Sequence, residues 1–368
     1  MRVLVCPDSY KGVLSAFEAA QVMKNAVIHV FPHAEIDFCP MADGGEGTLS
    51  VWVNATKARV LDVCACDPFG NPITCQAAFC EDTEQVLLEA AQTCGLPSLQ
   101  RRMPKYMLST GLGLAIKNVL AMLPKARIHV ALGGTGTVDG GLGAAMALGL
   151  RVFSHGQEIF PVSPLDLPED LRVTCDFSFA HPPVFLCDTQ AFLLGPNGAV
   201  ALFGAQKGVC ATDAPNFEKS LSVFARALAQ TAGMTFLDRP GFGAAGGLAV
   251  PFSLLWGSLC VSGARTLMQT MDFVRRVRTA DFVITGEGRL DTTSFLGKLV
   301  GEIYTVCRDN GRKVWVFPGQ VANLSIPPDM HVFPTSCVDN IPAPERAAHD
   351  LFCVVVQAFE KLQENHLS

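Results

Sequence analysis

Residues 280–298, "ADFVITGEGRLDTTSFLGK", contain an apolar run, a loop of glycines and acids, and then a segment of helical composition. This order of strand, glycine-rich loop and helix is typical of an α/β unit. The N-terminus repeats it, because the apolar "RVLVC" (2–6) precedes "SAFEAAQVMKNAVIHVF" (15–31), whose apolar residues recur at helical spacing after a capping box of Ser15 and Glu18. Both ends of the chain are therefore predicted to belong to one doubly wound, mostly parallel sheet.

Four loops are predicted to lie along one edge of that sheet. In doubly wound sheets, ligands bind beyond the carboxyl ends of the strands. The loops are "PDSYKG" (7–12), "ADGGEGT" (42–48), "TGEGRLD" (285–291) and "PGQ" (318–320). Glycines let another molecule approach the backbone closely. The carboxylates among them would repel a bare phosphate, so they are expected to bind an accompanying cation or to face a hydroxyl or ammonium group.

The middle of the chain predicts a second α/β domain, inserted into the first. Residues 60–82 alternate in polarity and contain turn residues, which predicts an antiparallel hairpin, and residues 84–95 are expected to form a helix that ends at Gly95. Residues 127–149 again give strand, glycine loop and helix, and a further strand is predicted to end at Asp188. The predicted domains are residues 1–58 with 272–368, and residues 59–271.

Composition excludes several classes of function. Hydrophobic residues make up 49% of the 368 residues and charged residues 17%, with a net charge of -6, so large buried cores are expected and nucleic acid is an unlikely partner. Residues 240–264 carry no charge, but their glycines favour a buried loop leading into a core helix over a membrane span. The fourteen cysteines are scattered and the N-terminus lacks a signal-peptide pattern, which indicates the cytoplasm.

Standard cofactor and hydrolase motifs do not account for the glycine-rich loops. Residues 241–246, "GFGAAG", fit the dinucleotide fingerprint but do not follow a strand, which makes a nicotinamide dehydrogenase the least favoured alternative. The sequence has neither a P-loop nor a G-x-S-x-G elbow, and its histidines lie outside the glycine loops.

Six loops instead combine glycine with hydroxyl, acidic or basic side chains. Backbone N–H groups and lysines can hold phosphates, while carboxylates can hold magnesium or accept a hydroxyl proton, so the combination suits phosphoryl transfer. The residues are Asp8, Ser9 and Lys11; Asp43, Glu46 and Thr48; Ser109 and Thr110; Thr135, Thr137 and Asp139; Gln206 and Lys207; and Glu287, Arg289 and Asp291.

The same loops resemble a known family. "PDSYKGVLSAFEAA", "PMADGGEGT", "LGGTGTVDGGLGAAMALG", "FGAQKG", "GFGAAGGL" and "ITGEGRLDTTSFLGK", in this order, are similar to the bacterial glycerate kinases that form 2-phosphoglycerate. The resemblance implies two α/β domains with the active site in the cleft between them, ATP with Mg²⁺ as phosphoryl donor, and D-glycerate as acceptor. The matching positions are Asp8, Ser9, Lys11, Asp43 to Thr48 (with Gly44 and Gly45), Asp139, Lys207, and Glu287 to Asp291.

A mechanism follows as a hypothesis. One or more of Asp43, Glu46, Glu287 and Asp291 would hold magnesium. Lys207 or Lys11 would offset charge on the transferred group, Asp188 or Asp139 would accept the proton of the C2 hydroxyl, and Arg289 would bind the carboxylate of the acceptor. The expected partners are ATP and a small hydroxy acid, without nucleic acid or membrane; the oligomeric state stays open, with a homodimer as one option.

The sequence also departs from the family pattern. Val138 stands where an asparagine is expected, Leu114 replaces a glutamate, Ala205 replaces a proline, and "TQAFL" follows Asp188 in place of an asparagine and a proline. These departures leave two alternatives open: a diverged kinase for another small hydroxy acid, or a catalytically silent relative that binds a ligand.

Overall fold

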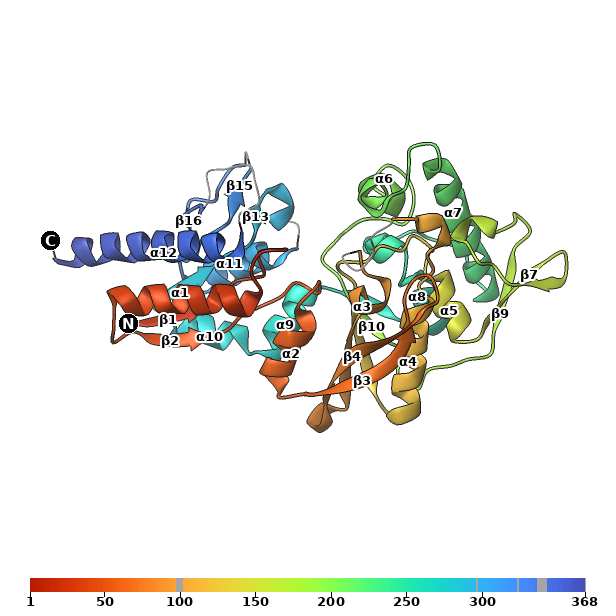
Figure 1. Ribbon diagram of the computed structural model, residues 1–368, viewed down its shortest axis with the longest axis horizontal. Coiled ribbons are helices and arrows are strands. Elements are labelled where there is room, and N and C mark those ends of the chain that lie inside the picture. The colour runs from red at the N-terminus through yellow and green to blue at the C-terminus, as the bar shows by residue number, and fades with distance from the viewer. Residues whose placement is uncertain (97–101, 296, 323, 336–342, 368) are drawn as a thin grey trace. The chain divides into compact units, whose positions relative to one another are not determined.

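The chain folds into two units, and each unit has its own sheets. The computed structural model describes residues 1–96, 102–295, 297–322, 324–335 and 343–367. Unit 1 consists of Met1–Asp43 together with Ser262–Ser368, and unit 2 is the continuous segment Gly44–Val261. Both units have the α/β architecture that the sequence predicts (Figure 1).

Unit 1 is built on a five-stranded, fully parallel sheet in the order β16-β14-β12-β1-β2. Its strands are β1 (Arg2–Val5), β2 (Glu35–Phe38), β12 (Phe282–Thr285), β14 (Val314–Val316) and β16 (Met330–Val332). β1 and β12 are neighbours, with Val3 paired to Phe282. The prediction that both ends of the chain share one parallel sheet is therefore confirmed.

Helices cover both faces of this sheet. α1 (Ala16–Val30) and α12 (Pro344–Leu367) pack together with Val3 and Val5 on one face, while α10 (Phe273–Thr279) lies under the other (Figure 1). α9 (Gly263–Thr270) and α11 (Leu299–Asp309) pack against α10. α1 begins at the predicted capping box, because Ser15 Oγ accepts a hydrogen bond from the backbone N–H of Glu18 and the Glu18 carboxylate accepts one from that of Ser15.

Unit 2 contains a six-stranded mixed sheet in the order β11-β10-β6-β5-β4-β3. β3 and β4 form the predicted hairpin, and β5, β6, β10 and β11 run parallel. The six strands are β3 (Arg59–Cys66), β4 (Pro72–Cys80), β5 (Gln85–Glu89), β6 (Arg127–Ala131), β10 (Val184–Leu186) and β11 (Leu259–Val261).

Residues 84–95 do not form the predicted helix. β5 takes up Gln85–Glu89, and only α3 (Ala91–Cys94) is helical. Val86 and Leu88 pack in one core cluster with the buried side chains of α4 (Thr110–Met122). Leu87, which points to the other face of the sheet, is also fully buried. Burial on both sides of a central strand therefore overrides the helical propensity of this segment.

The remaining helices of unit 2 surround its sheets. α2 (Thr48–Thr56) packs on β4 and β5, and the ring of its Trp52 lies 5.4 Å from that of His129 in β6. A three-stranded antiparallel sheet, β8-β7-β9, packs with α7. Its elements and the other helices are β7 (Leu150–Ser154), β8 (Gln157–Ile159), β9 (Arg172–Cys175), α5 (Leu142–Ala147), α6 (Ala199–Phe203), α7 (Ala214–Thr231) and α8 (Val250–Trp256).

The division between the units differs from the predicted one at both junctions. The boundaries fall after Asp43 and after Val261, rather than after residues 58 and 271. α2 belongs to unit 2 because it packs on β4 and β5, and α9 belongs to unit 1 because it packs on α10 and α11. The tertiary packing of α2 and α9 sets these junctions, and local composition does not reveal it.

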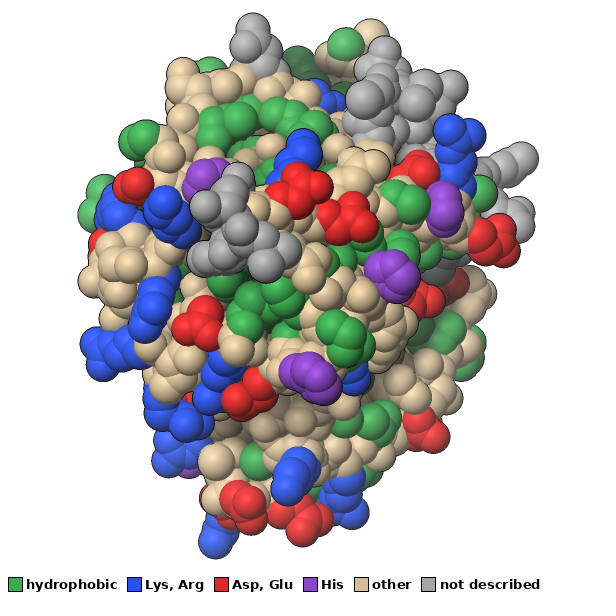
Figure 2. Space-filling model, turned by 90° about the vertical axis from the view of Figure 1, so that its left-hand side faces the viewer, with side chains coloured by type: hydrophobic (Ala, Val, Ile, Leu, Met, Phe, Trp, Pro, Cys, Tyr) green, Lys and Arg blue, Asp and Glu red, His purple; other side chains and the backbone are tan. Residues whose placement is uncertain are grey.

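The uncharged segment 240–264 belongs to unit 2 as far as Val261 and contributes there to the core. It contains α8, whose Phe252 is fully buried beside Phe185. Among the described residues, no helix is both long and apolar enough to cross a membrane. Figure 2 shows one face of the molecule, where basic and acidic side chains are interspersed with hydrophobic ones.

Candidate active site

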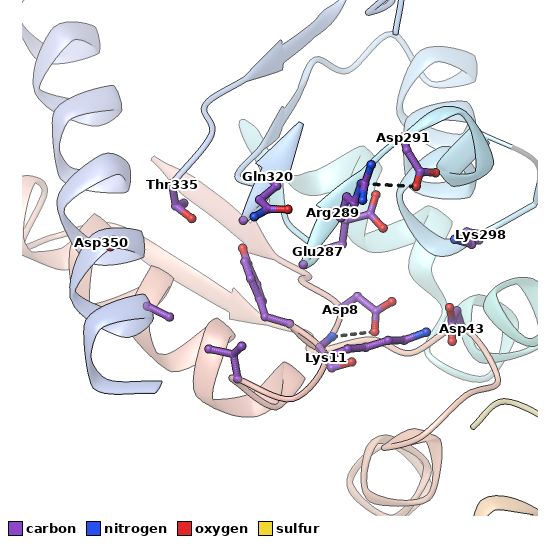
Figure 3. Close-up of a pocket in the computed structure, with 16 residues that line it drawn as sticks. Asp8, Lys11, Asp43, Glu287, Arg289, Asp291, Lys298, Gln320, Thr335 and Asp350 are labelled. Carbon is purple, nitrogen blue, oxygen red and sulfur yellow. Dashed lines mark hydrogen bonds and ion pairs between the residues drawn. The ribbon is translucent and has the colours of Figure 1, made fainter. Parts of the chain in front are cut away.

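A pocket of about 480 Å³ opens at the carboxyl edge of the sheet of unit 1 (Figure 3). The strand order reverses at this point, because the chain runs from β1 outward to β2 on one side and from β12 to β14 and β16 on the other. Such a topological switch point is where open α/β sheets bind ligands. The pocket is lined mainly by the loops after β1, β12 and β14 and by α12.

The backbone of these loops is tied together below the pocket. The hydroxyl of Tyr10, from the loop after β1, donates to the carbonyl of Phe317 after β14. The N–H of Asp8 donates to the carbonyl of Gly286 (2.9 Å), and that of Gly319 donates to the carbonyl of Glu287 (2.9 Å). These bonds fix the backbone positions that carry the charged side chains of the three loops.

The loops after β12 and β14 then continue side by side as a short parallel ladder. It consists of β13 (Arg289–Leu290) and β15 (Gln320–Val321). At the entry to this ladder, a side chain at position 319 would place its Cβ 2.5 Å from the carbonyl oxygen of Gly288, so only glycine fits. The two strands hold the Arg289 and Gln320 backbones beside each other at the pocket wall.

Two acids in the pocket are unusually easy to protonate. Burial raises the pKa of Asp8 well above its usual range, and the neighbouring charge of Asp43 raises it further. Burial also raises the pKa of Glu287 to about 7, and its Oε1 atom is buried without a hydrogen-bond partner among the described residues. An unsatisfied buried acceptor costs free energy, so this Glu287 oxygen is a candidate to bind a ligand.

Basic side chains line the same pocket. Lys11 follows Tyr10, and Lys298 immediately precedes α11 and donates from Nζ to the hydroxyl of Thr293 (2.6 Å). The Arg289 guanidinium lies 4.0 Å from the Asp291 carboxylate, and the Arg289 side chain is mostly exposed. The pocket thus combines lysines and an arginine with several carboxylates.

Seven of the predicted site residues gather at this pocket. They are Asp8, Ser9, Lys11, Asp43, Glu287, Arg289 and Asp291. Of the four predicted metal ligands, Glu46 is exposed and belongs to unit 2. No group of three or more potential metal ligands is close together within the described residues. The remaining carboxylates suit Mg²⁺, which usually takes one or two carboxylates together with substrate phosphates.

In unit 2, the predicted residues of the loop after β6 lie in a buried hydrogen-bond network. The Asp139 carboxylate accepts from the N–H (2.7 Å) and hydroxyl (2.8 Å) of Ser109, and from the N–H groups of Gly141 (3.1 Å) and Gly143 (3.0 Å). The Ser109 hydroxyl also accepts from the N–H of Ala144 (3.0 Å). Asp139 therefore joins the start of α4 to the start of α5.

Lys207 anchors the same loop. Its Nζ atom donates to the hydroxyl of Thr135 (3.1 Å) and to the carbonyl of Thr137 (3.1 Å), and its side chain is 3% exposed. Burial lowers the pKa of Lys207 to about 8, although the charges of Cys94 and Asp139 act to raise it. Gln206, beside it, is exposed and accepts a hydrogen bond from Arg102 through its carbonyl (2.9 Å).

The "ADGGEGT" loop is divided between the units. Asp43 lines the pocket of unit 1, whereas residues 44–48 belong to unit 2. There, the Gly44 carbonyl accepts from the N–H of Gly133 (3.2 Å), and the Thr48 hydroxyl donates to the Gly45 carbonyl (2.7 Å). Position 133 requires a glycine, because a Cβ there would lie 2.3 Å from the Cα of Gly45.

The other predicted residues of unit 2 stand at the starts or ends of elements. Thr110 is the first residue of α4 and lies against Gly143, and partly buried Asp188 follows β10. Sequence reasoning missed several residues that line the pocket of unit 1. They are Tyr10, Val13, Lys298, Thr335, Ala347 and Asp350. Lys298 ends the stretch 280–298 from which the prediction began, but nothing in the sequence singles out Thr335 or Asp350.

Comparison with known proteins gives one consistent result. Residues 3–338 match the glycerate kinase family. The chain is 34% identical over 304 residues to the glycerate kinase of Bacillus subtilis, which covers 81% of this chain and 79% of that protein. It is 31% identical over 309 residues to the glycerate 2-kinase of Escherichia coli K12, with 81% and 80% covered.

A solved structure agrees. A crystal structure from Salmonella typhimurium LT2, described as that of a candidate glycerate kinase 2, superposes with a TM-score of 0.81 at 26% identity and covers 100% of both chains. The motifs, the fold and the relatives therefore lead to one conclusion: the chain belongs to the glycerate kinase family.

Proposed function

We propose that this protein transfers the γ-phosphoryl group of ATP to the C2 hydroxyl of D-glycerate, which gives ADP and 2-phosphoglycerate. The observation that carries the proposal is the charged pocket at the switch point of unit 1, in a chain of the glycerate kinase family. The similarity to a glycerate 2-kinase supports C2 as the position phosphorylated. The reaction would take place in the cytoplasm, as the sequence predicts.

The pocket offers the charges that phosphoryl transfer requires. Lys11 and Lys298 can offset the negative charge of phosphate oxygens, and Asp43, Glu287 and Asp291 are the carboxylates available to a magnesium ion. These carboxylates would hold the magnesium ion, which would supply positive charge to stabilise the transferred group. The raised pKa of Glu287, caused by burial, would fall when a cation binds beside it.

The geometry of unit 2 favours Asp188 over Asp139 as the group that accepts the hydroxyl proton. Both Asp139 oxygens already accept hydrogen bonds from N–H or O–H donors, and the side chain is 1% exposed. These bonds engage both oxygens of Asp139 within the protein, away from a substrate hydroxyl. We therefore assign proton transfer to Asp188, which follows β10, and assign to Asp139 the positioning of the loop after β6.

Lys207 is assigned a positioning role as well. Its ammonium group is buried between Thr135 and Thr137, so it acts on the reaction through the glycine-rich loop that carries them. This assignment replaces direct contact with the transferred phosphoryl group, which the sequence left open between Lys207 and Lys11.

The departures from the family pattern are compatible with activity. Val138 is fully buried in an apolar cluster with Leu142, Leu193 and Leu221, where an amide would lack partners from these neighbours. Ala205 is exposed, and Leu114 is partly buried within α4. The valine is therefore explained by packing, which favours a working kinase over a silent relative.

The first test measures turnover. ADP release by the full-length protein is followed with Mg²⁺ and ATP, with and without D-glycerate, and phosphorus NMR identifies the phosphorylated carbon. We expect release that depends on D-glycerate, with phosphate on C2. Phosphate on C3 would contradict the assigned position. No acceptor-dependent release from folded protein would contradict the proposal and favour another hydroxy acid or a silent relative.

The second test concerns the base. We expect Asp188→Asn to lower kcat by about 100-fold or more, because general-base catalysis contributes roughly 10²–10⁴. The matched control is Asp62→Asn, which removes an exposed carboxylate from β3 and should keep normal turnover. Near-normal turnover in Asp188→Asn would exclude Asp188 as the base.

A further inference from the structure

The pocket of unit 1 is large for the acceptor alone. Its volume of about 480 Å³ falls within the range of roughly 300–1,000 Å³ that holds drug-sized ligands. A three-carbon hydroxy acid would fill only a small part of it.

The two sides of the pocket differ in chemistry. Lys11, Asp43 and Lys298 stand at one side in Figure 3, and Thr335 and Asp350 stand at the other. The elements agree with this view, because Lys298 caps α11 on one face of the sheet, whereas α12 packs on the opposite face. One side of the pocket is therefore rich in charge.

The opposite side holds the carboxylate of Asp350, but its other named side chains are neutral. Val13 and Ala347 are partly buried and pack against the apolar cluster that α1 and α12 share. Both side chains also line the pocket, as do the Thr335 hydroxyl and the Gln320 amide. Aliphatic side chains give a flat ring something to pack against, and a hydroxyl and an amide can pair with the polar edge of a base.

We propose that this pocket is the nucleotide subsite, entirely contained in unit 1. The base lies at the side of Val13, Ala347 and Thr335, and the phosphates with their magnesium lie at the side of Lys11, Asp43 and Lys298. The proposal rests on the proposed function only in taking a nucleoside triphosphate as the donor. It moves Arg289 from the acceptor's carboxylate to the phosphates, and it leaves the acceptor outside this pocket.

The first test places a larger side chain at the proposed position of the base. Val13→Phe should weaken the binding of MgATP, measured by titration calorimetry on the full chain, by about tenfold or more, and should leave Mg-tripolyphosphate within about twofold. Lys298→Met should weaken both ligands by about tenfold, since both carry the phosphates. The matched control is Val274→Phe, the same change on α10 at a 40% exposed position outside the pocket, and should weaken neither ligand.

Clear outcomes would overturn the proposal. Unchanged MgATP binding in folded Val13→Phe and Lys298→Met would place the nucleotide elsewhere. A rise in the KM for D-glycerate in Val13→Phe, with the KM for MgATP unchanged, would identify the pocket as the acceptor site.

A second test needs no variant. The unmodified protein is photolabelled with 8-azido-ATP, and the labelled peptides are mapped by mass spectrometry. We expect the label in peptides of unit 1 that contain Val13 or Ala347, and its loss with excess MgATP. Label confined to peptides of unit 2 would overturn the proposal.

The two proposals can fail separately. Nucleotide binding with the expected variant pattern, but no ADP release with D-glycerate, would contradict the proposed function and leave the subsite standing. Acceptor-dependent ADP release together with labelling of unit 2 would do the reverse.

Discussion

The two units use the same order of strand, glycine-rich loop and helix, yet the loops end differently. In unit 1 the strand order reverses between β1 and β12, and the loops on the two sides leave a pocket. In unit 2 the parallel strands β5, β6, β10 and β11 follow one another in chain order, so they contain no such reversal. The glycine-rich loop after β6 instead packs within unit 2, where the hydrogen bonds of Asp139 and Lys207 hold it in place.

The difference shows that a glycine loop with an acid has two distinct uses. Asp8 and Glu287 are buried acids with raised pKa values beside open space. Asp139 is a buried acid whose oxygens are fully engaged by N–H and O–H donors. The first arrangement is suited to a ligand and the second to holding a loop in place.

Asp139→Ala provides the strongest test of this contrast. The substitution leaves four donors buried without their charged acceptor, so we expect the free energy of unfolding to fall by about 4 kcal/mol. Urea unfolding followed by fluorescence measures it. Asp67→Ala is the control, because that aspartate accepts similar bonds in an exposed turn and should cost about 1 kcal/mol. Unchanged stability with lost turnover would instead make Asp139 the base.

The pH dependence of the free energy of unfolding tests whether the Lys207 ammonium group is shielded from water. Burial lowers its pKa from 10.5 to about 8. Between these values the unfolded chain binds the proton that the folded chain has released, so stability rises with pH. At about 1.4 kcal/mol per pKa unit, the gain relative to Lys207→Met should approach about 3 kcal/mol between pH 8 and 10.5. If the free energies of unfolding of the two proteins differ by the same amount at every pH in this range, the Lys207 ammonium group is hydrated.

Gly319→Ala tests how closely the pocket of unit 1 depends on its backbone. The new Cβ would lie 2.5 Å from the Gly288 carbonyl oxygen, so the loops after β12 and β14 must separate. We expect a loss of about 2 kcal/mol in stability and weaker binding of MgATP. Gly311→Ala is the control, because its new Cβ would meet no neighbour; its φ of +65° strains an alanine, so this variant also loses stability but should leave MgATP binding unchanged. Normal binding by Gly319→Ala would mean that the pocket tolerates this separation.

Tyr10→Phe is expected to have the smallest effect. It leaves the buried Phe317 carbonyl without its donor, which should cost about 1–2 kcal/mol in the free energy of unfolding. Thermal unfolding measures the change, and Tyr106→Phe, at a 50% exposed position, serves as the control. Equal stability of the two variants would show that the Tyr10 hydroxyl does not tie the loops together.

Local patterns predicted those parts of the fold that depend on neighbouring residues. The capping box at Ser15 and the turn between β3 and β4 depend on short stretches of sequence, and both are present in the structure. β5 was missed because its leucines and glutamate, together with the two alanines that follow it, favour a helix, whereas pairing with β4 and β6 makes Gln85–Glu89 a strand. The unit boundaries differ from the predicted ones because the tertiary packing of α2 on β4 and β5, and of α9 on α10 and α11, decides to which unit each helix belongs.

The site divides in the same way. Acids and lysines in the loops after β1 and β12 could be predicted, because the carboxyl ends of parallel strands converge on one edge. Thr335 and Asp350 could not, since they reach the pocket through the path of the chain after β16 and the docking of α12. The role of Asp139 was also hidden, because its four donors come from two helix starts that are separated in sequence.

The insertion of unit 2 also sets an order of assembly on the ribosome. β1 pairs with β12, and the N–H of Arg2 donates to Asp281, a partner 279 residues away. Unit 2, in contrast, is one continuous segment that has been synthesised completely before β12 exists. Domains generally fold as units during synthesis, and closing a long loop around a folded insert costs less than closing a disordered one. β1 can therefore pair with β2 early, but its other edge waits for β12 until unit 2 has been made.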